Sequence, residues 1–169
     1  APATAAMPDP APETQALEWR CVGPHVGNRG CGVAMHPTDR NVFYHAHSSG
    51  GVWKTENEGV TWTSLFDEQA STAIGDIAIA PSNQDIVWVG TGEPNIFRSS
   101  MAGCGIYFSP DGGETWEHKG LEGTHTIARI VIHPENPEIV YAAALGCLWN
   151  ANPERGLYRT SDGGASWEK

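Results

Sequence analysis

The amino-acid sequence predicts an all-β fold, chiefly because one pattern occurs three times along the chain. The copies are VAMHPTDRNVFYHA at residues 33–46, IAIAPSNQDIVWVG at 77–90 and IVIHPENPEIVYAA at 130–143. Each copy contains an alternating apolar strand, a proline, a polar turn and a second strand with an aromatic residue. No stretch of ten residues shows the 3.6-residue period of an amphipathic helix, so we expect almost no helix.

A second signature follows each copy. It reads GVWKTENEGVTW at residues 51–62, GIYFSPDGGETW at 105–116 and GLYRTSDGGASW at 156–167. Counted from Asn57, Asp111 and Asp162, the copies are 54 and 51 residues apart. A period of about 50 residues with four short strands is typical of a propeller blade. The sequence therefore predicts a partial β-propeller of about three four-stranded blades, near residues 30–66, 74–118 and 126–169.

The elements of each blade follow from local residue chemistry. Pro37, Pro81 and Pro134 each end a first strand and begin a turn, because proline fixes φ and cannot donate to a strand ladder. In the first blade we expect strands near residues 32–35, 42–45, 51–55 and 61–65, with equivalents in the other two. In the second signature, glycine allows the positive φ that the turn between the third and fourth strands needs, and the tryptophan at the end of the signature covers that turn.

The second signature resembles the Asp box, Ser/Thr-x-Asp-x-Gly-x-Thr/Ser-Trp. Its matching positions are Thr55, Asn57, Gly59 and Trp62, then Ser109, Asp111, Gly113 and Trp116, then Thr160, Asp162, Gly164 and Trp167. Over residues 17–169 the chain is similar to bacterial Asp-box (BNR-type) repeat propellers, the sialidase-like and sortilin-like proteins often labelled glycosyl hydrolases. The box carboxylates are interpreted as structural, because they can accept hydrogen bonds from the N–H groups of a tight turn. We expect the three box tryptophans to be mostly buried.

Composition and the first residues restrict the functional classes. Residues 1–16 are rich in alanine and proline and predict a flexible tether. The start Ala-Pro is typical of a processed N-terminus, so we expect an exported, periplasmic or extracellular protein. A net charge of −10 argues against nucleic acid as a partner, and no apolar run is long enough to span a bilayer. The tether could still hold the chain near a membrane complex. No cofactor is expected.

One end of the predicted blades carries the longest loops, and the candidate residues for a binding or catalytic site lie there. Glu93 is the candidate acid–base residue, with Asp76 as a weak partner, since glycosidases need two carboxylates. Further candidates for a sugar or carboxylate site on this face are His25, Arg29, His47, Arg98, His125, Trp149 and Arg155. Ordinary loop capping is the competing interpretation, and it is favoured for each of them.

Two further residue pairs have positions that bear on metal binding and on disulfide formation. His45 and His47 are two apart on a strand and point the same way, but no third ligand supports a metal site, so no metal is expected. Cys104 and Cys147 fall in loops at the same end of adjacent blades and are the better disulfide candidates, although four cysteines allow three connectivities.

Two classes of function remain open. Closed propellers use about 4 to 8 blades, so three blades leave the faces at both ends of the arc uncovered. We expect a protein partner, self-association or further blades of a longer chain to cover them. The favoured hypothesis is a non-catalytic binding or scaffold module, a role that the resemblance to photosystem assembly factors also implies. The alternative is the N-terminal part of a sialidase-like or xyloglucanase-like glycoside hydrolase, with carbohydrate as ligand; no Arg-Ile-Pro motif supports a sialidase.

Overall fold

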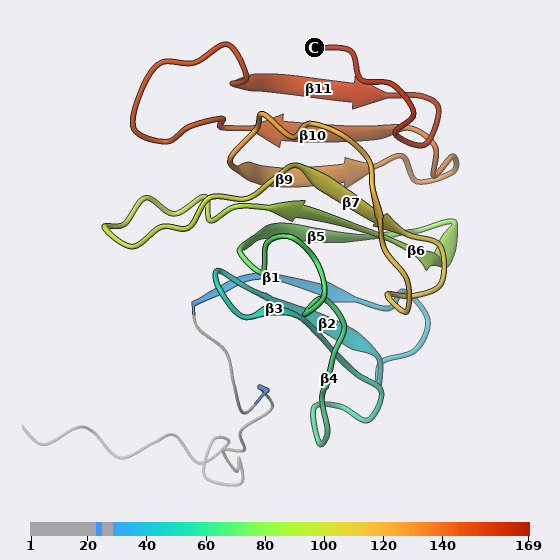
Figure 1. Ribbon diagram of the computed structural model, residues 1–169. Helices are drawn as coiled ribbons and strands as arrows, with labels where there is room; N and C mark the ends of the chain where they lie inside the picture. Colours follow the sequence, from blue (N-terminus) through green and yellow to red (C-terminus); the bar gives the residue numbers. More distant parts are fainter. Residues whose placement is uncertain (1–22, 25–28) are drawn as a thin grey trace, which may run out of the picture.

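Three antiparallel sheets make up the part of the chain that the structure describes, residues 23–24 and 29–169 of a computed structural model. They stack one above the other in chain order (Figure 1). The predicted tether and His25 lie outside the described residues. Within the described residues there is no helix, as the sequence predicted.

Each sheet follows the chain as an antiparallel meander, and each corresponds to one predicted blade. Blade one contains β1 (Gly30–Met35), β2 (Phe43–His47), β3 (Gly51–Thr55) and β4 (Thr63–Ser64). Blade two contains β5 (Ile74–Ala80), β6 (Asn83–Thr91), β7 (Ile106–Ser109) and β8 (Glu117–His118). Blade three contains β9 (Ile127–Ile132), β10 (Val140–Ala144) and β11 (Gly156–Thr160). It has three strands where four were expected, and a single bridge from Arg159 to Glu168 marks the place of the fourth.

The core is divided into two layers, one at each junction between blades. Between blades one and two, Tyr44 and Val52 pack with Phe66, Ile77 and Val89. Between blades two and three lies a second cluster, made of Ala80, Trp88, Ile106, Ile127, Ile130, Ile132, Val140 and Ala142. Alternate residues of a strand point to opposite faces, so each blade contributes one face to each junction. This stacking confirms the all-β partial propeller.

The Asp-box turns have the structure that their residues indicate. Asp111 Oδ1 accepts from Thr115 N at 2.8 Å, and its Oδ2 accepts from the Thr115 hydroxyl at 2.6 Å. Asp162 makes the same two bonds with Ser166, at 2.9 and 2.6 Å. In the first box the amide of Asn57 replaces the carboxylate, with Oδ1 accepting from Thr61 N and Nδ2 donating to its hydroxyl. The box aspartates are thus structural.

The box tryptophans connect neighbouring blades, and they are half-buried where the sequence predicted mostly buried. Trp116 Nε1 donates to the carbonyl of Leu65 at 2.8 Å, and Trp167 Nε1 donates to that of Lys119 at 2.7 Å. Trp62 has no preceding blade among the described residues and donates to Gly59 O of its own turn. The rings of Trp116 and Trp167 each cover the edge of a junction and stay partly exposed.

The box carboxylates predict an acid-dependent loss of stability. Hydrogen bonds from Thr115 lower the pKa of Asp111 to about 2, and those from Ser166 and Thr160 lower that of Asp162 to about 2. A carboxyl whose folded pKa lies below its unfolded value stabilises the fold above pH about 4, and that contribution is lost as the pH falls toward 2. Asp111→Ala should cost about 0.5–1 kcal/mol at pH 7, because the bonds are charge-assisted but exposed.

Urea unfolding at pH 7 and pH 3 measures this contribution. Asp111→Asn is the matched control, since Asn57 already fills the equivalent position of the first box. It should keep most of the stability at pH 7 and show a weaker acid dependence. An Asp111→Ala variant as stable as the natural protein at both pH values would contradict the structural role.

Candidate functional site

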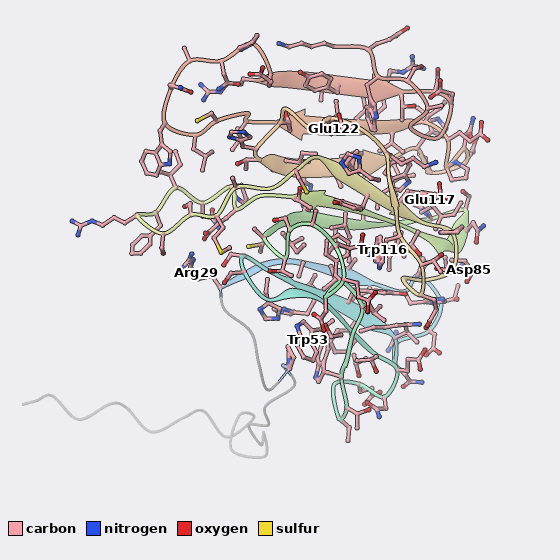
Figure 2. All side chains as sticks on the ribbon, viewed as in Figure 1. Arg29, Trp53, Asp85, Trp116, Glu117 and Glu122 are labelled. Carbon is pink, nitrogen blue, oxygen red and sulfur yellow. The ribbon has the colours of Figure 1, made fainter. Side chains whose placement is uncertain are left out.

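The turns and loops of the blades separate onto two ends of the stack. The proline turns and Asp boxes share one end, where Glu58 N donates to Asn41 O at 3.1 Å and Gly112 N donates to Asp85 O at 2.7 Å. The β6–β7 and β10–β11 loops project together from the opposite end (Figure 1). Figure 2 places Arg29 at that same end and Asp85 at the other. We call the end with the long loops the loop end.

Glu93 is held by an ion pair across the junction of blades one and two. Its Oε1 accepts from Arg29 Nε at 2.6 Å and its Oε2 from Arg29 Nη2 at 2.7 Å. The Glu93 side chain has no exposed surface, whereas that of Arg29 is 40% exposed. The Arg29 guanidinium also lies over the Phe97 ring, 5.5 Å from its centroid. The candidate acid–base residue is therefore the buried half of a bidentate pair.

Asp76 lies at the junction of blades two and three, between β5 and β9, the first strands of these blades. Its Oδ2 accepts from the backbone N–H of Ile130 at 2.7 Å, which joins β5 to β9. Arg129 Nη1 lies 3.8 Å from its Oδ1. Burial raises the pKa of Asp76, and the N–H of Ile130 opposes that shift. Glu93 and Asp76 thus have separate partners, each at a junction between blades.

The loop end carries a small cavity between blades two and three. It has a volume of about 50 Å³. Its walls come from the β6–β7 loop, the segment before β9 and the β10–β11 loop, and include Ser100, Met101, Ala102, His125, Leu148 and Trp149. Of the candidates on this face, His125 and Trp149 line the cavity. Arg98 is exposed in the same β6–β7 loop.

Arg155 has a structural part in this end of the molecule. Its Nε donates to Leu145 O at 2.9 Å, and its Nη2 donates to Cys147 O at 3.1 Å and to Asn150 O at 3.3 Å. Asn152 Nδ2 adds bonds to Cys147 O and Asn150 O. The two side chains thus fix the backbone that presents Trp149, which is the loop-capping interpretation that the sequence favoured.

The two histidines of β2 meet as expected from their spacing. His45 Nδ1 lies 2.9 Å from His47 Nε2. Burial and the neighbouring His47 lower the pKa of His45. Among the described residues no group of three or more side chains is arranged to hold a metal ion.

The expected disulfide between Cys104 and Cys147 is wrong, because both residues are free thiols. Cys104 Sγ is directed into the first junction, 3.3 Å from the hydroxyl of Tyr107, and packs against the core between blades one and two. Cys147 lines the cavity between blades two and three. The prediction rested only on the two loops lying at the same end of adjacent blades. That is not enough for a disulfide, because the two sulfurs face different junctions.

Sequence reasoning missed the ion pair and the apolar walls of the cavity. Arg29 and Glu93 are 64 residues apart, and no local pattern indicates that they meet. Met101 and Leu148 read as ordinary loop residues, but a cluster of exposed large side chains in two long loops was an available signal. Ile96, Phe97, Met101 and Trp149 are all among the exposed large apolar residues.

The fold and the loop end together define a partial β-propeller, and comparison with known proteins agrees. No family model matches the chain. A xyloglucanase from Hypocrea jecorina is 26% identical over 175 residues, covering 94% of this chain and 20% of the relative. A xyloglucanase from a Paenibacillus species is 24% identical over 151 residues, covering 82% of this chain and 14% of the relative. The chain therefore spans a fifth or less of the curated relatives that it matches.

Solved structures show the same fold at lower identity. An ancestral GH74 enzyme superposes with a TM-score of 0.68 at 24% identity, covering 90% of this chain and 19% of that one. YCF48 bound to D1 peptide superposes with a TM-score of 0.59 at 16% identity, covering 86% of this chain and 42% of that one. The chain is thus a partial propeller similar to GH74 xyloglucanases and to YCF48, and the sialidase-like and sortilin-like labels stay predictions. Within the described residues there is no helix that could cross a membrane.

Proposed function

We propose that this chain is a non-catalytic segment of an Asp-box propeller that works as a binding and scaffold unit. The observation that carries the proposal is the engagement of both candidate carboxylates at junctions between blades. Glu93 is fully buried in its pair with Arg29, and Asp76 accepts the N–H of Ile130. A general acid or base must reach the substrate directly or through one water, and neither group is placed to do so.

The outer face of blade three supports a docking role. Tyr141 pairs with Val131 as Trp88 pairs with Ala78 and as Tyr44 pairs with Ala34. Tyr44 and Trp88 are buried by the following blade, whereas Tyr141 is exposed. Leu157 likewise occupies the position of Val52 and Ile106, which have no exposed surface, yet it is 61% exposed. Positions that are buried at both junctions are thus open on blade three.

The outer face of blade one is also exposed, and it is the face that points toward the preceding blade in the repeat. Val33 and Met35 occupy the positions of Ile77 and Ile79, which face the preceding blade, and both are exposed. Trp53 lies on this side of blade one, away from blade two (Figure 2). Val52, in contrast, is buried between blades one and two. Another blade of the same kind would fit either outer face, because both faces carry apolar residues at the repeat positions that pack together at the two junctions.

The test is a charge on the outer face of blade three. When a second copy of the purified protein covers this face, Leu157→Glu should lower the melting temperature by about 5 °C or more, because it places a charge in a contact worth about 2 kcal/mol. Val60→Glu is the matched control: Val60 is 67% exposed in the Asp-box turn of blade one, outside either outer face. Equal melting curves and equal sedimentation of the two variants would refute the docking role.

A second candidate function is supported by the curated relatives, which are xyloglucanases. In that case the chain forms the first part of a longer carbohydrate-active enzyme. Release of reducing ends from xyloglucan distinguishes the two functions. Glu93→Gln would abolish release if Glu93 were the acid–base residue, and activity lost in this way would replace the non-catalytic proposal.

A further inference from the structure

The cavity at the loop end has walls that are fixed before any ligand arrives. Gly103 N donates to His125 O at 2.7 Å, which ties the β6–β7 loop to the segment before β9. Glu93 N donates to Met101 O at 3.0 Å, and Ser100 Oγ accepts from Phe97 N at 2.7 Å. Arg155 holds the opposite wall through three backbone carbonyls. Little conformational entropy remains to be lost on binding, which favours affinity.

The side chains around this cavity are unusual for a solvated loop. Trp149 is 66% exposed although its backbone is held in place, and Ile96, Phe97 and Met101 are exposed in the facing loop. Aromatic, methionine and arginine side chains are enriched at the centres of protein interfaces. Aliphatic groups offer no hydrogen bonds to sugar hydroxyls and a thioether sulfur is only a weak acceptor, so this composition fits a peptide side chain better than a sugar ring.

The charge at this place differs from that of the whole chain. The chain has 20 acidic and 10 basic residues. None of the described residues that line the cavity is acidic, and His125 is one of them. Arg98 lies two residues before Ser100 in the wall loop, and its side chain is exposed. Of the acidic residues that flank this region, Glu93 is buried with Arg29, and Glu154 is half-buried with its Cγ near Gly123.

We propose that this cavity binds an aliphatic side chain of an acidic, extended peptide. The aliphatic group enters between Met101 and Trp149, and a neighbouring carboxylate of the peptide contacts Arg98. A volume of about 50 Å³ accommodates one small aliphatic group. This inference rests on the proposed binding role and names the partner class for the loop end, a surface distinct from the outer faces of blades one and three.

The test uses labelled hexapeptides with a central valine or leucine flanked by glutamate and aspartate, and a matched set flanked by lysine and arginine. Fluorescence anisotropy with the purified protein should show saturable binding of the acidic set only. Trp149→Ala and Arg98→Glu should each weaken binding at least tenfold. Val60→Ala, at the opposite end, should leave it unchanged. Circular dichroism and melting curves verify that each variant is folded.

Three results would overturn the proposal. They are equal binding of the basic set, absence of saturable binding to the natural protein, and affinity unaffected by Trp149→Ala. A xyloglucan heptasaccharide that binds in a Trp149-dependent way while the acidic peptides do not would also overturn it in favour of a sugar site. The docking role is tested separately, since Leu157→Glu leaves the loop end intact and its outcome does not change the peptide result.

Discussion

Replacing Gly75 with alanine should destabilise the protein by about 3 kcal/mol or more. Gly75 lies in β5, which packs against β9 of blade three. A Cβ at this position would collide with the carbonyl oxygen of Ile127 and lie 2.5 Å from that of Gly92. Both obstacles are backbone atoms, Gly92 in the same blade and Ile127 in blade three, so neither can rotate away, and relief requires the backbone at both places to shift.

Chemical denaturation of Gly75→Ala and of a matched glycine variant checks this expectation. Gly123→Ala is the control, because a Cβ there would meet only the flexible Glu154 side chain, at 3.4 Å. Its stability should stay within about 0.5 kcal/mol of the natural protein. If Gly75→Ala unfolded at the same denaturant concentration as Gly123→Ala, the close contact of the inner strands would be wrong.

The sequence predicted the elements that depend on neighbouring residues. Strands β1, β2 and β3 were expected near residues 32–35, 42–45 and 51–55, and they span Gly30–Met35, Phe43–His47 and Gly51–Thr55. Alternation, proline and glycine act locally, so they can be read without the rest of the fold. The Asp-box hydrogen bonds were predictable for the same reason, since donor and acceptor lie within four residues.

The candidate site depended on packing between blades, which the sequence does not display. Cys104 was assigned to a disulfide from its loop, and only the stacking of the sheets shows that it packs against the core between blades one and two. Val52 and Leu157 occupy the same position of the repeat, but one is buried and the other exposed because only one of them has a blade next to it. The repeat therefore predicts which face is apolar, while its neighbours determine what is buried.

The Arg29–Glu93 pair should be strongly asymmetric when its members are replaced one at a time. Arg29→Met leaves the Glu93 carboxylate without a counter-ion at a place with no exposed surface. Stranding a buried carboxylate in this way costs about 3–5 kcal/mol, so the melting temperature should fall by about 10 °C. Glu93→Gln leaves Arg29 in contact with solvent, and the amide oxygen can still accept one hydrogen bond. Its melting temperature should fall by less than half as much.

Thermal melts of the two single variants and of the double variant, followed by circular dichroism, measure this asymmetry. The double variant should be more stable than Arg29→Met alone, because removing the carboxylate also removes the unpaired charge. That order would follow only if Glu93 is buried at the junction of blades one and two. Were Glu93 an accessible acid–base group at the loop end, water would solvate it after Arg29→Met. The two single variants would then melt at nearly the same temperature, and the junction role of Glu93 would be refuted.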